Sequence, residues 1–329
     1  MKFRTEIAIP ESSWKIDHST KGIAIGSCFT DYIGNMLHTA KFPISVNPFG
    51  TVYNPASIAN SFELLYGSTQ IDKSDVILNA GLWTSFYLHS SFSAESPEKV
   101  LANSASRIAE TQKLQPIDYA LITLGTAWVY VYKKSGKIVS NCHKFPAGEF
   151  TRKRLSVAET ETSLTEIIRT IRTESPECRI IFTISPIRHW KDGAHENQVS
   201  KSTLFLAIDT ILSEEKNIHY FPAYEILMDE LRDYRFYAED MLHPNATAVQ
   251  YIQEQFCKTY FSHKTRIIQG KIEAILRAMQ HRPFHTKSTE YKKFIETSIH
   301  KIEEIQKQNP TIDVSKELRY FSDTKDSFE

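Results

Sequence analysis

Residues 22–40 read GIAIGSCFTDYIGNMLHTA: an apolar run, a Gly-Ser pair and then an amphipathic stretch. The first five residues suit a buried strand. From Cys28 onward, apolar side chains recur at helical spacing, at Phe29, Ile33, Met36, Leu37 and Ala40. A strand that passes directly into a helix begins a β-α-β unit, and this pattern sets our expectation for the rest of the chain.

The same alternation continues along the chain. Further strands are expected at 43–46, 82–88, 118–124, 179–184 and 217–221, and helices at 55–66, 96–113, 156–173 and 198–214. Residues 128–142 are expected to form a hairpin around Lys134-Ser135-Gly136. Strands that alternate with helices predict a parallel sheet covered on both faces and linked by right-handed crossovers. The predicted fold class is therefore α/β, a three-layer sandwich with a central, mostly parallel sheet.

The C-terminal part has a different pattern, which is helical only from residue 246 onward. In 288–308, Lys and Glu lie four residues apart, which is typical of a solvated helix face. We divide the chain into an α/β domain over 1–264 and a helical extension over 265–329 that packs on this domain or projects from it. Its helices are the surface through which we expect the protein to form homo-oligomers.

Composition excludes several kinds of partner. Lys plus Arg and Asp plus Glu number 39 each, so the chain has no overall charge that would attract nucleic acid or an anionic membrane. No segment approaches the ~20 apolar residues of a membrane span, and the N-terminus lacks the apolar core of a signal peptide. We expect a cytoplasmic protein with reduced thiols, because its four cysteines lie far apart without a CxxC pair.

Small polar residues follow several of the expected strands. In an open parallel sheet, sites form beyond the carboxyl ends of the strands, where Ser27, Thr126 and Ser185 are expected to lie. The N–H groups at the start of the following helix would stabilise an oxyanion next to Ser27. Ser27 is therefore a candidate nucleophile. The alternative is that Ser27 only caps this helix.

A serine nucleophile needs a base, because its hydroxyl is almost wholly protonated at neutral pH. Asp240 and His243 lie three residues apart in YAEDMLHPNA (237–246), just before a helix that Asn245 could cap. On a turn, this spacing can place the carboxylate against one imidazole nitrogen while the other faces outward. The alternative is a surface histidine at the start of a helix.

The Gly-Ser pair after the first strand and the D-x-x-H before the last helix of the α/β region resemble the SGNH (GDSL-type) hydrolases over about residues 20–260. More closely, GSCF at 26–29 resembles the signature of the GSCFA family. Seven further stretches are similar to that family: NPFGTVYNP (47–55), LHSSFS (88–93), GTAWVY (125–130), NCHKFP (141–146), SPIRHWKDG (185–193), ENQVSK (196–201) and DMLHPN (240–245).

The resemblance implies a flavodoxin-like α/β/α sandwich in which Ser27 is the nucleophile, His243 the general base and then acid, and Asp240 the group that orients His243.

Two positions depart from the superfamily pattern. Gly26 stands where GDS has its aspartate, and Trp128 stands where the GxND block has its asparagine. We therefore expect an oxyanion hole of other groups: the backbone N–H of Ser27 and Gly50, with Asn54 or Thr126 as side-chain donors. Asn54 has a competing role as a helix cap.

By resemblance, the protein is expected to be a serine esterase or O-acyltransferase. Its expected substrate is a small molecule or carbohydrate that carries a small acyl ester, such as an O-acetyl group, and no cofactor or metal is expected. Candidate pocket residues are His89, Trp128, His143, Arg188 and His189.

Two alternatives stay open: a catalytically degenerate carbohydrate-binding or scaffolding module, and a thiol enzyme that uses Cys28. We expect Cys28 instead to pack behind the nucleophile, pointing away from it along the helix.

Overall fold

The computed structural model of the protein describes residues 4–67, 69–286 and 288–326. These residues form two compact units. The first unit consists of residues 4–9, 21–35 and 44–255, and the second unit of residues 10–20, 36–43 and 256–326. The second unit thus begins earlier than the predicted helical extension and includes two N-terminal segments, while the boundary at residue 264 stays a prediction.

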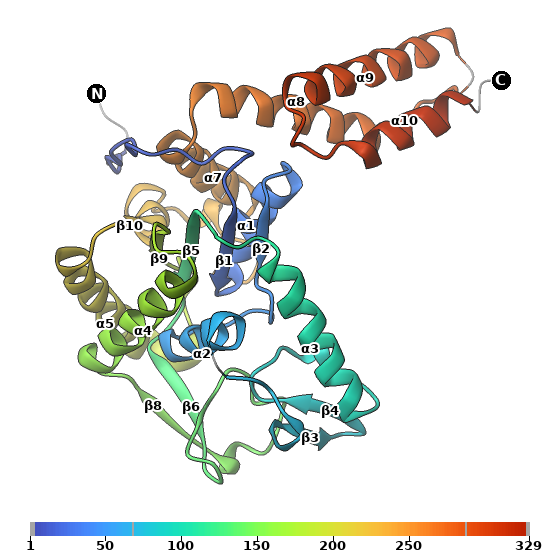
Figure 1. The fold of residues 1–329 in the computed structure, drawn as a ribbon. Coiled ribbons are helices and arrows are strands. Elements are labelled where there is room, and N and C mark those ends of the chain that lie inside the picture. The colour runs from blue at the N-terminus through green and yellow to red at the C-terminus, as the bar shows by residue number, and fades with distance from the viewer. Residues whose placement is uncertain (1–3, 68, 287, 327–329) are drawn as a thin grey trace. The chain divides into compact units, whose positions relative to one another are not determined.

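A five-stranded parallel sheet forms the centre of the first unit (Figure 1). Its strands are β1 (Gly22–Gly26), β2 (Ile44–Val46), β5 (Tyr119–Leu124), β9 (Arg179–Ile184) and β10 (Ile218–Phe221). The order β10-β9-β5-β1-β2 corresponds to the flavodoxin-like order of doubly wound sheets. Every residue of β1 and β5 is buried, as expected for strands covered on both faces. The predicted α/β fold class is confirmed.

Helices lie on both sides of this sheet (Figure 1). The first unit contains α2 (Pro55–Tyr66), α3 (Pro97–Gln112), α4 (Val157–Glu174), α5 (Gly193–Glu214) and α6 (Ala223–Glu225), and the helices α1 (Cys28–Thr39) and α7 (Ala246–Tyr260) begin in it. One apolar cluster joins Ile25 of β1 to Ile58 of α2 and Ile167 of α4. Because burial of this face removes large apolar side chains from water, the cluster stabilises the layered arrangement.

Two small antiparallel sheets accompany the central sheet. One pairs β3 (Val76–Asn79) with β4 (Leu82–Ser85), and the other has the order β7 (Ile138–Val139), β6 (Trp128–Tyr132), β8 (Phe150–Arg154). The expected hairpin at 128–142 is therefore present, as β6 and β7. Strand β8 was not predicted, because its sequence FTRKR is mostly charged and only Phe150 is buried. Its pairing with β6, rather than its own pattern, makes it a strand.

The second unit contains three further helices, α8 (His263–Gln280), α9 (Thr289–Gln308) and α10 (Ser315–Asp326). Isoleucines of α8 and α9, with Phe321 of α10, form its apolar cluster. Helix α10 lies within the predicted helical extension, but no separate helix was assigned to it, because its sequence is strongly polar and one of its two buried residues is Glu317. That carboxylate pairs with Lys41, whose Nζ lies 2.7 Å from Oε1. Within the described residues, no helix has the length and apolarity needed to cross a membrane.

Candidate active site

The turn from β1 into α1 places Ser27 at the carboxyl edge of the sheet. Gly26 has a φ of +153°, and a Cβ there would lie 2.2 Å from the Thr123 carbonyl oxygen, so only glycine allows the two strands to approach this closely. The Ser27 N–H then donates to the same carbonyl oxygen at 3.1 Å. The backbone around Ser27 is therefore fixed by the neighbouring strand β5.

Ser27 is only 1% exposed, and its Oγ has no hydrogen-bond partner among the described residues. The capping alternative is not supported, because the N–H of Thr30 donates to the Ser27 backbone oxygen at 2.8 Å and leaves Oγ free. Leaving a buried hydroxyl unpaired costs about 1–3 kcal/mol. Unpaired buried hydroxyl groups are rare in folded proteins, and a catalytic role would explain this one.

An asparagine that the sequence analysis did not single out supports this turn. Asn47 Oδ1 accepts the N–H of Gly26 at 2.9 Å, and its Nδ2 donates to Asp31 Oδ1 at 2.7 Å. Burial raises the pKa of Asp31, and the hydrogen bond from Asn47 partly offsets this effect. The position of Asn47 at the head of the NPFG stretch was the available signal, but only the tertiary structure shows what it contacts.

We expect Gly26→Ala to lower the free energy of unfolding by about 3 kcal/mol, because the new Cβ would clash with the Thr123 carbonyl oxygen at an unfavourable φ. Gly148→Ala is the matched control, since a Cβ on Gly148 would have no atom within 4 Å. Urea unfolding of both variants measures the difference. Equal stability of the two variants would show that the turn tolerates a side chain at residue 26.

The second half of the site is the loop before α7. His243 Nδ1 lies 2.5 Å from Asp240 Oδ2, while Asp240 Oδ1 accepts the backbone N–H groups of Leu242 and His243, each at 2.9 Å. These three interactions, with the backbone bonds first, lower the pKa of Asp240 to about 2. Asn245 caps α7 as expected, since its Oδ1 accepts the N–H of Ala248. The carboxylate thus fixes the orientation of the imidazole ring and leaves its Nε2 atom available for another interaction.

One pocket of about 640 Å³ has both Ser27 and His243 in its wall. Six other predicted residues also line it: Asn54, His89, Thr126, Trp128, Arg188 and His189. Burial lowers the pKa of His189 to about 4, so this imidazole is neutral at pH 7. Within the described part of the chain, no hydrogen bond joins Ser27 to His243. Both residues line one cavity, and the hydroxyl of Ser27 is buried in its wall.

Three of the predicted site residues have other roles. The Ser27 N–H donates to the Thr123 carbonyl oxygen, and the Gly50 N–H donates to the Asn47 carbonyl oxygen at 2.8 Å. Because both donors are occupied, the predicted backbone oxyanion hole is wrong. His143 does not line the pocket. Its Nε2 contacts the Ser85 carbonyl oxygen at 2.7 Å, and burial lowers its pKa, so this imidazole holds the β4 segment in place.

Asn54 can serve two purposes at once. Its Oδ1 accepts the N–H of Ser57 at 2.8 Å and so caps α2, as the sequence indicated. This assignment leaves the Nδ2 donor, and Asn54 lines the pocket. Thr126, the other predicted donor, has its Oγ1 3.0 Å from the hydroxyl of Ser200 and 3.1 Å from the N–H of Trp128. Asn54 is therefore the more available side-chain donor.

Cys28 lines the pocket as well, so the prediction that it packs behind the nucleophile is wrong. Burial nevertheless raises the pKa of its thiol, and the nearby Asp31 raises it further. A protonated thiol is a poor nucleophile. The thiol of Cys28 thus lies in the pocket, as a thiol enzyme would require. Its raised pKa keeps it protonated, however, and so disfavours it as the nucleophile.

A buried lysine beneath the pocket was missed by the sequence analysis. Lys201 is fully buried, and its Nζ donates to the carbonyl oxygen of Ser185 at 2.6 Å. Burial lowers the pKa of its ammonium group to about 7. Asn197, one turn earlier on α5, accepts the N–H of His189 at 3.0 Å. Residues 196–201 therefore anchor the backbone of the loop after β9. In the sequence, the only signal for this role was the resemblance of this stretch to the GSCFA family.

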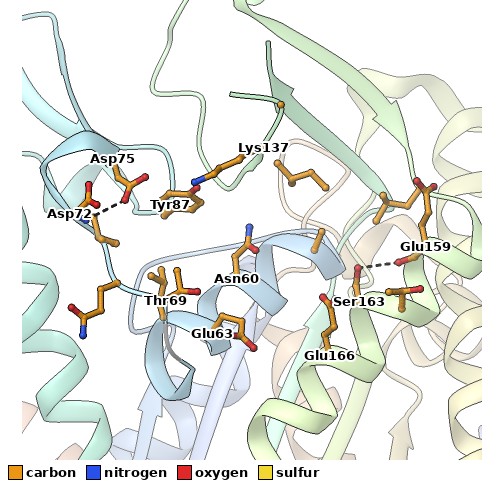
Figure 2. A pocket seen from close by; sticks show the side chains of 18 of the residues that line it. Asn60, Glu63, Thr69, Asp72, Asp75, Tyr87, Lys137, Glu159, Ser163 and Glu166 are labelled. Atoms are coloured by element: carbon orange, nitrogen blue, oxygen red, sulfur yellow. Dashed lines mark hydrogen bonds between the residues drawn. The ribbon is translucent and has the colours of Figure 1, made fainter. Parts of the chain in front are cut away.

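A second pocket, of about 760 Å³, lies elsewhere in the first unit and is rich in carboxylates (Figure 2). Glu63 bonds to Arg169 and Thr170, and Glu159 bonds to Lys153 and the N–H of Ser156. These carboxylates already stabilise the helices on which they lie. No group of three or more His, Cys, Asp or Glu side chains in the described residues could hold a metal ion.

The fold and the site define an α/β protein of flavodoxin-like topology with a serine and a carboxylate-bound histidine at the carboxyl edge of its sheet. The sequence matches two family profiles: "GSCFA family" over residues 21–256 and "GSCFA domain protein, C-terminal domain" over residues 272–324. Since the first match covers well over half of the chain, this protein belongs to the GSCFA family. No curated protein has a sequence that matches it.

Solved structures similar to this chain include three esterases. A carbohydrate esterase of family 2 from Corynascus thermopiles (Myceliophthora fergusii) has a TM-score of 0.39 and 13% identity, with 80% of this chain and 69% of that chain covered. An acetyl xylan esterase from Butyrivibrio proteoclasticus has a TM-score of 0.39 and 10% identity, over 77% and 64% of the two chains. A family 3 carbohydrate esterase from Talaromyces cellulolyticus has a TM-score of 0.35 and 9% identity, over 76% and 99%. Similarity at this level does not define the reaction.

Proposed function

We propose that this protein is a serine hydrolase that acts on small acyl esters. The proposal rests on one observation: the unpartnered hydroxyl of Ser27 shares a pocket with His243, whose Nδ1 is held by Asp240. A nucleophile, a base and a group that orients the base are the parts that acyl transfer needs. In enzymes without bound substrate, the contact between nucleophile and base is often loose, so the lack of a direct bond between Ser27 and His243 is compatible with this role.

In the proposed reaction, Ser27 Oγ attacks the ester carbonyl carbon while His243 Nε2 accepts the hydroxyl proton. Asp240 stabilises the imidazolium that forms, and the imidazolium then gives the proton to the departing alcohol. The acyl group remains on Ser27 until water or a second alcohol attacks it. Hydrolysis and O-acyl transfer use the same steps, and the acceptor decides between them.

During the attack, negative charge develops on the carbonyl oxygen of the ester, and hydrogen-bond donors must stabilise it. The N–H groups of Ser27 and Gly50 cannot do so, because they already donate to backbone carbonyl oxygens. We assign this role to Asn54 Nδ2, since Oδ1 of the same amide is occupied by the helix cap. The N–H groups of Cys28 and Phe29 at the start of α1 are the second source, because the first N–H groups of a helix have no acceptor within it. Both sources adjoin the pocket wall that contains Ser27 and Cys28.

Aromatic side chains favour an alcohol that presents a flat or sugar-like face, such as an O-acetylated carbohydrate. Tyr53, Trp128 and Tyr130 all line the pocket. The guanidinium of Arg152 lies over the Trp128 ring, 4.2 Å from the centroid, and so occupies one of its faces. Tyr53 is 37% exposed and is therefore the residue we propose for stacking on the substrate.

A fluorophosphonate probe, which labels activated serines, tests the proposal together with hydrolysis of p-nitrophenyl acetate. We expect the wild-type protein to be labelled and Ser27→Ala to lose both labelling and hydrolysis. Ser140→Ala is the matched control, because Ser140 also lines the pocket with a buried hydroxyl that has no partner among the described residues. Cys28→Ala is expected to retain labelling.

The other outcomes separate the alternatives. Labelling that persists in Ser27→Ala would overturn the assigned nucleophile, and loss of hydrolysis in Cys28→Ala alone would favour the thiol enzyme. A folded wild-type protein that neither reacts with the probe nor hydrolyses the ester would favour the binding or scaffolding module.

A further inference from the structure

The pocket that contains Ser27 has a strongly uneven charge distribution. Its wall includes three permanently or usually cationic side chains, those of Arg152, Arg188 and Lys191, and one carboxylate, that of Asp192. The chain as a whole has a formal net charge of 0, so this excess of positive charge is local. A cleft lined by charges of one sign concentrates ligands of the opposite sign.

The single carboxylate of the wall is already used. Asp192 forms an ion pair with Arg152, and its side chain is only 3% exposed. Arg152 is further fixed by its position over the Trp128 ring. This pair therefore accounts for one cation and one anion, and it leaves Arg188 and Lys191 without a neutralising carboxylate in the pocket wall.

Arg188 is half-buried, and its guanidinium has no hydrogen-bond or ion-pair partner within the described ranges. It also lines a neighbouring pocket with Asp233 and Asp240, but neither carboxylate lies within ion-pair distance. Asp240 is engaged by His243, and Asp233 lies 3.7 Å from Arg235. A guanidinium keeps its proton under all ordinary conditions, so it cannot relieve partial burial by becoming neutral.

The backbone on either side of Arg188 is anchored. The N–H of Ile187 donates to Ser185 Oγ at 3.3 Å, and the N–H of His189 donates to Asn197 Oδ1 at 3.0 Å. The charge of Arg188 also reaches into the protein beneath the site, where it adds to the burial that lowers the pKa of Lys201. The unpaired cation thus projects from a fixed loop next to the proposed nucleophile and base.

We propose that Arg188 binds an anionic group, a carboxylate or a phosphate, on the ester substrate. A guanidinium presents paired N–H donors that match the oxygens of either group, and such charge-assisted bonds are stronger than neutral ones. The inference rests on the proposed function and makes it more specific: the substrate is an acyl ester of a molecule that carries negative charge, and Arg188 selects it.

Two acetyl esters of nearly equal size test this inference: 4-acetoxybenzoate, which is anionic, and its neutral methyl ester. We expect wild-type kcat/KM to be roughly 10- to 100-fold higher for the anion. Arg188→Gln should remove this preference mainly through KM, and Arg188→Lys should restore part of it. Arg154→Gln is the control, since Arg154 pairs with Glu196 and is not part of the pocket wall. Equal ratios of the two rates in wild type and Arg188→Gln would overturn the inference.

A binding measurement makes the test independent of catalysis. Calorimetric titration with 4-hydroxybenzoate and with methyl 4-hydroxybenzoate should show tighter binding of the anion to wild type, weakened by added salt and lost in Arg188→Gln. If no ester is hydrolysed but this pattern appears, the proposed function fails and the anion site stands. If hydrolysis occurs and the anion has no advantage in binding or rate, the anion site fails and the proposed function stands. If the anion has no advantage and no hydrolysis occurs, both fail.

Discussion

Replacement of His243 by alanine is expected to lower kcat for ester hydrolysis by about 10³-fold or more, because Ser27 would lose the group that accepts its proton. Asp240→Asn is expected to lower it by about 10²- to 10⁴-fold, since an amide cannot stabilise the imidazolium as a carboxylate does. Because the pKa of Asp240 is about 2, the carboxylate is charged throughout the pH range in which the folded protein would be assayed. Asp240 itself should therefore contribute no step to the pH profile of the rate between about pH 4 and 9.

The control for His243→Ala is His195→Ala, because His195 is exposed on α5 and lies outside the pocket wall. Single-turnover kinetics and thermal unfolding of each variant would separate lost chemistry from lost structure. A His243→Ala protein that keeps more than about a tenth of the wild-type rate would rule out this imidazole as the base.

Lys201→Met is expected to raise the free energy of unfolding by about 2–4 kcal/mol at pH 7. The pKa of this lysine falls from about 10.5 to about 7 on folding, which corresponds to a cost of at most about 4–5 kcal/mol for burying the ammonium. Methionine has a similar length and no charge, and part of the gain is offset by the lost bond to the Ser185 carbonyl oxygen.

The pH dependence of this effect has a definite sign. Below pH 7, the folded and unfolded states both bind the proton, so the full cost is present. Between about pH 7 and 10.5, the unfolded chain binds more protons than the folded one, and the stability of the wild type rises with pH. The advantage of Lys201→Met should therefore shrink as the pH increases.

Urea unfolding at several pH values would measure this trend, with Lys258→Met as the control, since Lys258 is exposed on a helix. A Lys201→Met protein that is less stable than wild type at pH 7 would show that the ammonium contributes more through its hydrogen bond than burial costs.

Local features of the site could be predicted from the sequence because their partners are close along the chain. Asp240 and His243 are three residues apart, so a tight turn is enough to join them. Asn54 caps a helix that begins at the next residue. The strand and helix around Ser27 follow from hydrophobic periodicity alone. In each case, the residues that matter and the residues they contact belong to one short segment.

Contacts made by the fold as a whole could not be predicted in this way. The predicted oxyanion hole failed because Thr123 and Asn47, which accept the N–H groups of Ser27 and Gly50, are positioned by neighbouring strands and loops. Lys201 was overlooked because a lysine in a helix is usually exposed, and only the packing of α5 buries it. A sequence pattern shows which side of a helix is apolar, but not which polar group another element brings to it.

The interleaved path of the chain determines how this protein can be divided. Phe42 stacks on Phe261 with ring centroids 5.0 Å apart, and the N–H of Ile16 donates to the Tyr260 carbonyl oxygen, so early and late segments share the core of the second unit. A fragment that stops at residue 255 would lack Tyr260 and Phe261, leave Phe42 exposed to water and promote aggregation. Recombinant work on the first unit should therefore retain the residues around 256–261, and any shortening should begin further toward the C-terminus.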